Sequence, residues 1–149
     1  MPETSKDREA VRRQLGRDPK PFAVAARCPF GLPAVIENER ARNMPTTFWL
    51  TCPHLDTEIA RVEATGGVRE AQKEVGERAI EDTHGEHLER FGVRVAGVRD
   101  GGYVKCLHAF TALHLSGAIP NPVGEWTMER IEGAYPAEGC CVLRGGKAG

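Results

Sequence analysis

Six prolines between residues 19 and 53 constrain the fold of this chain more than any other feature of its sequence. They are Pro19, Pro21, Pro29, Pro33, Pro45 and Pro53. Each proline fixes its own φ and keeps the preceding residue out of the helical region, so only short extended segments fit between them. Residues 22–27, 34–37 and 46–51 are apolar, β-branched or aromatic, which predicts three strands. Because residues 29–33 have the proline and glycine of a turn, we expect an antiparallel meander.

A cysteine followed by proline stands at the end of the first and of the third predicted strand. These are Cys28 and Cys52. The first and third strands of an antiparallel meander run in the same direction. We therefore expect the two cysteines to emerge at the same end of the sheet.

Apolar residues at three- and four-residue spacing predict helices in the rest of the chain. The predicted helices cover residues 4–15, 53–66, 68–91, 104–116 and 125–131. Ser5 is the expected N-cap of the first helix, and Cys52 would cap the second, with Pro53 at its first helical position. The charged 68–91 stretch predicts one or two surface helices, interrupted near Thr83 to Gly85.

The pattern indicates a single-domain α+β protein, with a small antiparallel meander sheet packed with several helices. At 149 residues the chain can bury one core without disulfides. We expect an N-terminal helix and linker over residues 1–19, a globular domain over 20–131, and a flexible glycine-rich tail over 132–149.

Composition excludes several classes of function. The formal net charge is -1 and the charges are interspersed, which argues against a nucleic-acid partner. No apolar run approaches the length of a membrane span, and the N-terminus lacks the layout of a secretory signal. We therefore expect a cytoplasmic protein without a membrane role, whose five cysteines stay reduced.

Four motifs in series resemble the bacterial family called domain of unknown function 501. They are Arg27-Cys28-Pro29-Phe30-Gly31-Leu32-Pro33-Ala34-Val35-Ile36, Phe48-Trp49-Leu50-Thr51-Cys52-Pro53, Val104-Lys105-Cys106-Leu107-His108-Ala109 and Asn121-Pro122-Val123-Gly124. The resemblance covers roughly residues 20 to 130. It implies a bacterial cytoplasmic protein and no established activity.

The chain departs from the family pattern at several positions. Phe110 stands where relatives often have a second histidine, which weakens a His-x-His metal motif. The link over residues 42–45 lacks the usual Asp-Gly turn, and His87 and Phe91 match only in part. The Cys140-Cys141 pair has no counterpart in the pattern, so we treat it as incidental.

The main site hypothesis is that Cys28, Cys52 and Cys106 bind one metal centre. Zinc would take His108 or His54 as fourth ligand, and an iron-sulfur cluster is the other candidate cofactor. The alternative is that these cysteines simply pack in the core. On a regular helix Cys106 and His108 point to nearly opposite sides, so both can be ligands only if Cys106 lies at or before the N-cap.

Three other interpretations stay open. Cys52 and Cys106 each precede a predicted helix, and Lys105 adjoins the latter, which favours a reactive thiolate for redox chemistry or sulfur transfer. Arg27 and Lys105 would flank a pocket for a nucleotide or a small anionic ligand or substrate, including a sulfur-containing one. In an enzyme, Glu63, Lys105 and His108 are the candidate catalytic residues, with Glu63 as counter-ion or general base.

The last interpretation is a non-catalytic interaction module. Its partner-binding aromatic residues would be Phe22, Phe30, Trp49 and Trp126. Aromatic residues are more often part of the core. His114 is expected to be an ordinary surface or core histidine.

Overall fold

The computed structural model of the chain describes residues 4–39 and 47–131. The predicted tail over residues 132–149 and the Cys140-Cys141 pair lie outside these residues. Within the described part, no helix combines the length and the apolar character needed to cross a bilayer.

The first helix, α1 (Ser5–Leu15), is bounded by strong capping signals at both ends. Thr4, one residue before the predicted cap, is the N-cap, and its side chain and that of Asp7 form a reciprocal capping box. Gly16 ends the helix with φ 75°, a left-handed conformation that glycine adopts without strain.

The predicted antiparallel meander is confirmed. The strands β1 (Phe22–Arg27), β2 (Pro33–Asn38) and β3 (Phe48–Leu50) form a three-stranded sheet in the order β1-β2-β3. Both neighbouring pairs are antiparallel, with Ile36 opposite Val24 on one side and Trp49 on the other. Cys28 and Cys52 therefore follow strands that run in the same direction, as expected.

Five α-helices and one short 3₁₀ helix follow the sheet in the described part of the chain. They are α2 (Pro53–Ala64), α3 (Gly67–Val75), α4 (Glu77–Phe91), η1 (Val95–Gly97), α5 (Leu107–Ser116) and α6 (Pro122–Glu129). Cys52 is the N-cap of α2, as predicted, and Gly117 ends α5.

The predicted break in the charged stretch and the predicted start of the last helix are both wrong. The charged stretch is interrupted at Gly76, whose φ of 92° and ψ of 148° are not helical, whereas Thr83 and Gly85 lie inside α4. Helix α6 begins at Pro122 rather than at Glu125, because the side chain of Asn121 caps it by accepting a hydrogen bond from the backbone N–H of Gly124.

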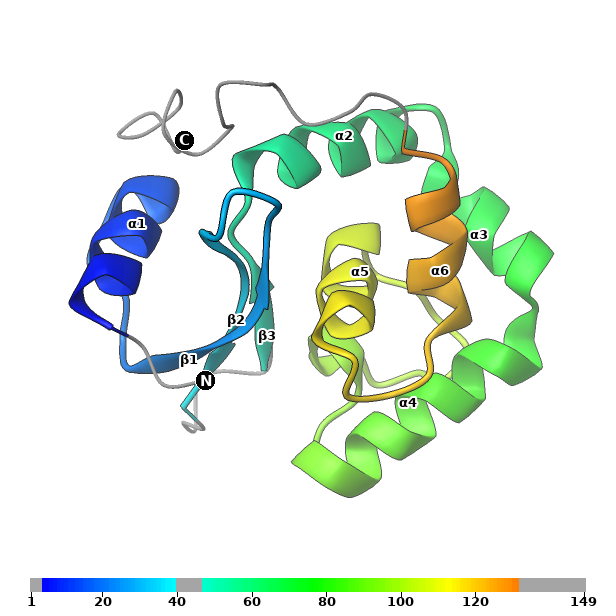
Figure 1. The fold of residues 1–149 in the computed structure, drawn as a ribbon. Helices are drawn as coiled ribbons and strands as arrows, with labels where there is room; N and C mark the ends of the chain where they lie inside the picture. Colours follow the sequence, from blue (N-terminus) through cyan, green and yellow to red (C-terminus); the bar gives the residue numbers. More distant parts are fainter. Residues whose placement is uncertain (1–3, 40–46, 132–149) are drawn as a thin grey trace.

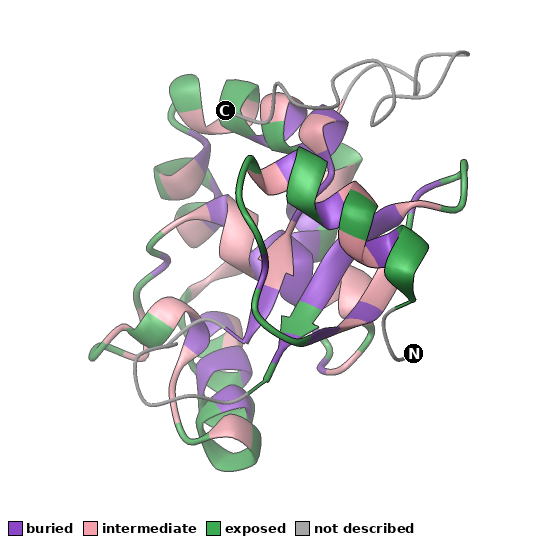
Figure 2. Cartoon of the chain, turned by 90° about the vertical axis from the view of Figure 1, so that its left-hand side faces the viewer, coloured by how far each residue is buried: buried purple, intermediate pink, exposed green. Residues whose placement is uncertain are grey.

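The sheet lies between α1 on one face and the other helices on the opposite face (Figure 1). Beneath α1, Val11 packs with Phe22, Val24 and Ile36. Viewed from the α1 side, the strands are mostly buried while the outer surface of α1 is exposed (Figure 2). Helix α1 therefore covers one face of the sheet.

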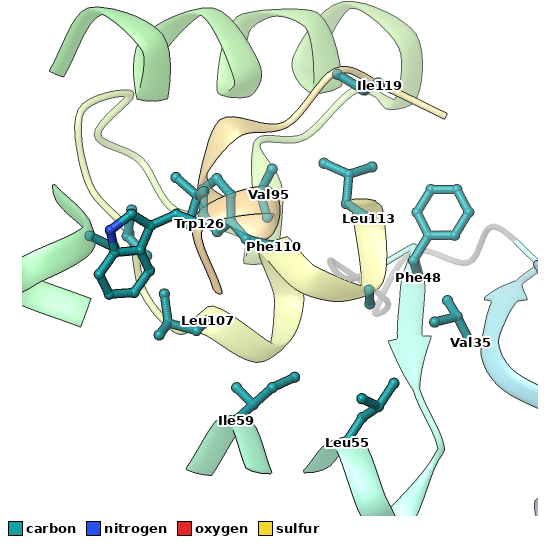
Figure 3. Packing of buried hydrophobic residues seen from close by; sticks show 14 of the residues in the cluster. Val35, Phe48, Leu55, Ile59, Val95, Leu107, Phe110, Leu113, Ile119 and Trp126 are labelled. Atoms are coloured by element: carbon teal, nitrogen blue, oxygen red, sulfur yellow. The ribbon is translucent and has the colours of Figure 1, made fainter. Parts of the chain in front are cut away.

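The larger core surrounds α5. Phe110 and Leu113 are fully buried, and they lie among side chains from β3, α2 and α6 (Figure 3). The ring of Phe110 also makes an edge-to-face contact with His84 of α4, with centroids 5.2 Å apart. Phe110 is thus a core residue, and the first turn of α5 remains for the site.

Candidate functional site

The candidate site is built around the start of α5, where Cys106 is the N-cap residue. Its backbone is extended, with φ -155° and ψ 154°, and its Sγ accepts a hydrogen bond from the N–H of Ala109 at 3.4 Å. The sequence pattern predicts a helix from Val104, but the N–H of Val104 donates instead to the side chain of Gln72 at 2.8 Å. This meets the condition under which Cys106 and His108 can face the same site.

Glu63, near the end of α2, contacts the start of α5. Its Oε2 accepts a hydrogen bond from the backbone N–H of Leu107 at 2.7 Å. A carboxylate suits this place because the first N–H groups of a helix have no partner within the helix. The bond orients Glu63 toward its neighbours on α5.

The imidazole of His108 lies between two carboxylates of α2. Its Nδ1 is 3.3 Å from Oε2 of Glu63, and its Nε2 is 3.1 Å from Oδ1 of Asp56. Nε2 also lies 3.2 Å from the backbone oxygen of Asp56. When Nε2–H donates to Asp56, the lone pair of Nδ1 faces Glu63, and a cation between these two atoms satisfies both.

Glu63, Cys106 and His108 form the one group of potential metal ligands found among the described residues. Their ligand atoms all lie within 4.8 Å of one another, and all three side chains are partly buried. Zinc bonds of about 2.0–2.1 Å to nitrogen and oxygen place two tetrahedral ligand atoms about 3.3 Å apart. The separation of His108 Nδ1 and Glu63 Oε2 is 3.3 Å.

The surroundings of Cys106 disfavour a free thiolate. Burial raises the pKa of the Cys106 thiol, and the nearby charge of Glu63 adds to this, while hydrogen bonds from backbone N–H groups act in the opposite direction. Without a cation at the site, Cys106 is therefore a protonated thiol at neutral pH. A bound metal reverses this preference because a ligating thiol is deprotonated.

Cys106 and His108 open onto a cleft of about 420 Å³. Its walls come from the end of α1, β3, α2, η1 and the start of α5. The lining residues are Leu15, Arg17, Phe48, Trp49, Leu50, Asp56, Ala96, Lys105, Cys106, His108 and Ala109. A cleft of this size accommodates a small molecule.

The other two cysteines of the predicted site lie elsewhere. Cys28 and Cys52 are 6% and 0% exposed, belong to the main hydrophobic core, and are not part of the Glu63–Cys106–His108 group. His54, the other proposed zinc ligand, is also buried and outside the group. In the part of the chain that the structure describes, all three cysteines are thiols rather than disulfides.

The two predicted anion-binding cations are in different surroundings. Lys105 lines the cleft. Arg27 instead forms a two-bond ion pair with Asp7 of α1, with both N–O distances 2.9 Å, and donates to the backbone oxygen of Gly31. Arg27 is not among the residues that line the cleft.

Sequence reasoning missed Asp56 and Arg17. Asp56 precedes Glu63 by seven residues on α2, a spacing that places both carboxylates on one helix face and could have indicated a paired role. Arg17 follows the cap of α1 and carried no comparable signal. Its guanidinium lies 5.4 Å from the ring centroid of Trp49.

Of the remaining histidines, two are bonded to the backbone around η1. His84 receives a hydrogen bond at Nδ1 from the N–H of Val95, and its Nε2 lies 2.6 Å from the oxygen of Tyr103. Nδ1 of His87 lies 2.6 Å from the oxygen of Val93. Both contacts support the loop that precedes α5, and neither histidine belongs to the candidate metal group.

The fold and the site together define a small α+β protein with clustered carboxylate, thiol and imidazole groups at one cleft. The model of the family described as "Protein of unknown function (DUF501)" matches residues 24–84 and 76–129. The chain belongs to this family, as its motifs predicted. No curated protein and no solved structure matches the chain.

Proposed function

We propose that this protein binds zinc through Glu63, Cys106 and His108, with the remaining coordination position open to the cleft. The observation that carries the proposal is the approach of these three ligand atoms to within 4.8 Å of one another. A thiolate, an imidazole and a carboxylate are the ligands that zinc uses in proteins. Three protein ligands with one open position are typical of catalytic rather than structural zinc sites.

Hydrogen bonds around each ligand support the proposal. Asp56 accepts from Nε2 of His108, the N–H of Leu107 donates to Glu63, and the N–H of Ala109 donates to Cys106. Such partners orient metal ligands, and a carboxylate behind a ligating histidine is a recurrent arrangement. All three ligands are thus held by neighbouring groups.

The ligand set favours zinc over an iron-sulfur cluster. Clusters are held mainly by cysteine thiolates, and this group contains one. Zinc polarises a bound oxygen or lowers the pKa of a bound water, which is the chemistry that such a site would supply to an enzyme. Lys105 and His108 line the cleft in which a small substrate would reach the metal.

The test is titration of chelator-treated protein with Co²⁺, a spectroscopic substitute for zinc, and with zinc followed by metal analysis. We expect one metal per chain and a sulfur-to-cobalt charge-transfer band. Glu63→Gln, Cys106→Ser and His108→Gln should each weaken binding strongly. Glu70→Gln, Cys28→Ser and His114→Gln are the matched controls, because none of these residues belongs to the group. Circular dichroism shows whether each variant is folded.

These variants, with Cys52→Ser added, separate this proposal from the three-cysteine hypothesis. If Cys28→Ser and Cys52→Ser abolish binding while Glu63→Gln does not, the cysteine centre is the correct one. Absence of metal binding by the folded wild-type chain would refute both.

The second candidate is metal-free thiol chemistry at Cys106. Of the three described cysteines, Cys106 alone lines the cleft, beside His108 and Lys105. The rate of alkylation of Cys106 against pH decides between the two candidates. Rapid alkylation of metal-free protein at neutral pH, with no metal bound, would favour a reactive thiol.

A further inference from the structure

The cleft beside the candidate metal site carries two cations that no described carboxylate pairs with. Arg17 and Lys105 both line it, and both are exposed. Neither forms a salt bridge with a described residue. By contrast, Arg27 pairs with Asp7 and Arg130 with Glu74. The two cations of the cleft are therefore available to a ligand.

Trp49 holds Arg17 at the cleft. The guanidinium carbon lies 5.4 Å from the centroid of the indole ring, within the range of a cation–π contact. Lys105 immediately precedes Cys106, so its position is set by the same N-cap that places the thiol. Two chain segments that are far apart in sequence thus present positive charge to one cleft.

Bound zinc would leave the cleft positively charged. Glu63 and the Cys106 thiolate together balance the charge of one divalent ion. Arg17 and Lys105 then face a single further carboxylate at the cleft, that of Asp56, which already accepts a hydrogen bond from His108. The balance favours an anion rather than a cation as ligand.

The rest of the cleft wall is apolar. Leu15, Trp49, Leu50 and Ala109 contribute to it, and each is partly exposed. Ala96 also lines it, with φ 60° and ψ 16°, and it is the one non-glycine residue of the described chain with positive φ. A non-glycine residue in this conformation stores strain, and such strain clusters at ligand sites.

We propose that this cleft binds a small organic anion, a carboxylate or phosphate ester with an apolar body. The anionic end contacts Arg17 and Lys105, and the body lies along the wall of Leu15, Trp49 and Leu50. This orientation brings the ligand to the open position beside Cys106 and His108, a step that rests on the proposed zinc site. The anion contacts themselves need only the cleft.

Fluorescence of Trp49 provides the test. The chain has two tryptophans, and Trp126→Phe leaves Trp49 as the one reporter. The probes are phenyl phosphate and benzoate, with phenol and benzylamine as uncharged and cationic analogues. Calorimetry on the unmodified chain repeats each titration, so the result does not depend on the tryptophan variant.

We expect phenyl phosphate or benzoate to change the Trp49 emission and to bind more tightly than phenol or benzylamine. Arg17→Ala and Lys105→Ala should each raise the Kd about tenfold, the loss expected for one charge-assisted contact. Arg13→Ala and Lys20→Ala should leave the Kd unchanged, because neither residue lines the cleft.

Equal binding of phenol or benzylamine, an unchanged Kd in both cleft variants, or no binding of either anion would overturn the inference. Each titration is run on chelator-treated and on zinc-loaded protein, with zinc content measured separately. Anion binding without zinc binding would leave the cleft assignment intact and refute the proposed function. Zinc binding without anion binding would refute the cleft assignment and leave the proposed function intact.

Discussion

Nδ1 of His108 lies 3.3 Å from Oε2 of Glu63, and this contact joins the first turn of α5 to the last turn of α2. The other ring nitrogen faces Asp56 on the same helix at 3.1 Å. Without a metal, a protonated imidazole can donate to both carboxylates. With a metal at Nδ1, only the Asp56 bond remains, and it fixes the ring. The prediction for Asp56 follows from this difference.

Asp56→Asn should weaken zinc binding without abolishing it. Asp56 orients the imidazole and is not itself in the ligand group, so the stoichiometry should stay at one metal per chain. Loss of such a supporting carboxylate typically costs about 10- to 100-fold in metal affinity. Competition with a chromophoric chelator measures the Kd.

Glu37→Gln is the matched control for Asp56→Asn, since Glu37 is an exposed strand residue outside the ligand group. An Asp56→Asn variant with wild-type affinity would show that the histidine needs no support from α2. Complete loss of binding in a folded variant would instead make Asp56 a ligand.

Zinc affinity should increase with pH across the neutral range. The pKa of Cys106 is raised by burial and by Glu63, so the thiol is protonated there and must lose its proton to bind metal. Calorimetry in buffers of different ionisation enthalpy measures the protons released. In the Cys106→Ser variant the pH dependence should be weaker, and a pH-independent affinity of the wild-type chain would contradict the assignment of Cys106 as a ligand.

Asp7→Asn should destabilise the fold by about 1–3 kcal/mol, the usual cost of leaving a partly buried charged group without its hydrogen-bonded partner. Asp7 has an 8% exposed side chain and forms two bonds to Arg27. Urea unfolding measures the change. Glu9→Gln, on the same helix in an exposed pair with Arg12, should change stability by at most about 0.5 kcal/mol.

The contribution of Asp7 should also depend on pH. Its hydrogen bonds with Arg27 lower the pKa of Asp7 in the folded protein below the value in the unfolded chain. The stabilisation is therefore complete above the unfolded pKa, and it is lost as pH falls through the lowered folded pKa. The stability difference between wild type and Asp7→Asn should be constant near neutral pH and shrink in acid. A difference that grows in acid would contradict this pairing.

Gly124→Ala should strongly destabilise the contact between α5 and α6. A Cβ at Gly124 would lie 2.3 Å from Cβ of His114 and 2.9 Å from the backbone oxygen of Phe110, so one helix must move. We expect a loss of about 1–3 kcal/mol, typical of overpacking, in thermal or urea unfolding.

Gly85→Ala is the control for this helix contact. Gly85 lies inside α4 and is exposed, and a Cβ added to it would meet no atom within 4 Å. Alanine should stabilise the helix by up to about 1 kcal/mol through its higher helix propensity. Equal effects of the two substitutions would show that close approach of α5 and α6 is not what requires glycine.

Local sequence signals predicted most of the fold. The prolines bounded the strands, and β1 has the predicted limits of residues 22 and 27. Pro53 marked the start of α2, with Cys52 as its N-cap, because the fixed φ of proline suits the first helical position. The break at Gly76 was missed because helical periodicity continues on both sides of it, and only the backbone angles reveal it.

The candidate site was predicted in part. Glu63, Cys106, His108 and Lys105 were singled out from the sequence. The structure brings ligand atoms of the first three within 4.8 Å of one another, and Lys105 lines the adjoining cleft. Arg27 was expected beside Lys105 but pairs with Asp7, twenty residues earlier. That pairing depends on how α1 lies on the sheet, which no local pattern specifies.

The sequence by itself determined the strands, the meander and the family, because each depends on residues close together in the chain. It left open whether Cys106 lies at the N-cap, where it can face the same site as His108, and the structure places it there. Only the tertiary structure decided which groups those two residues meet. Packing of α5 against α2 brings Glu63 and Asp56 to His108, while Cys28 and Cys52 stay in the core. Hydrogen bonds between these two helices join residues that are 44 and 52 positions apart in the sequence. They arise from the packing of whole helices, which local sequence patterns do not encode.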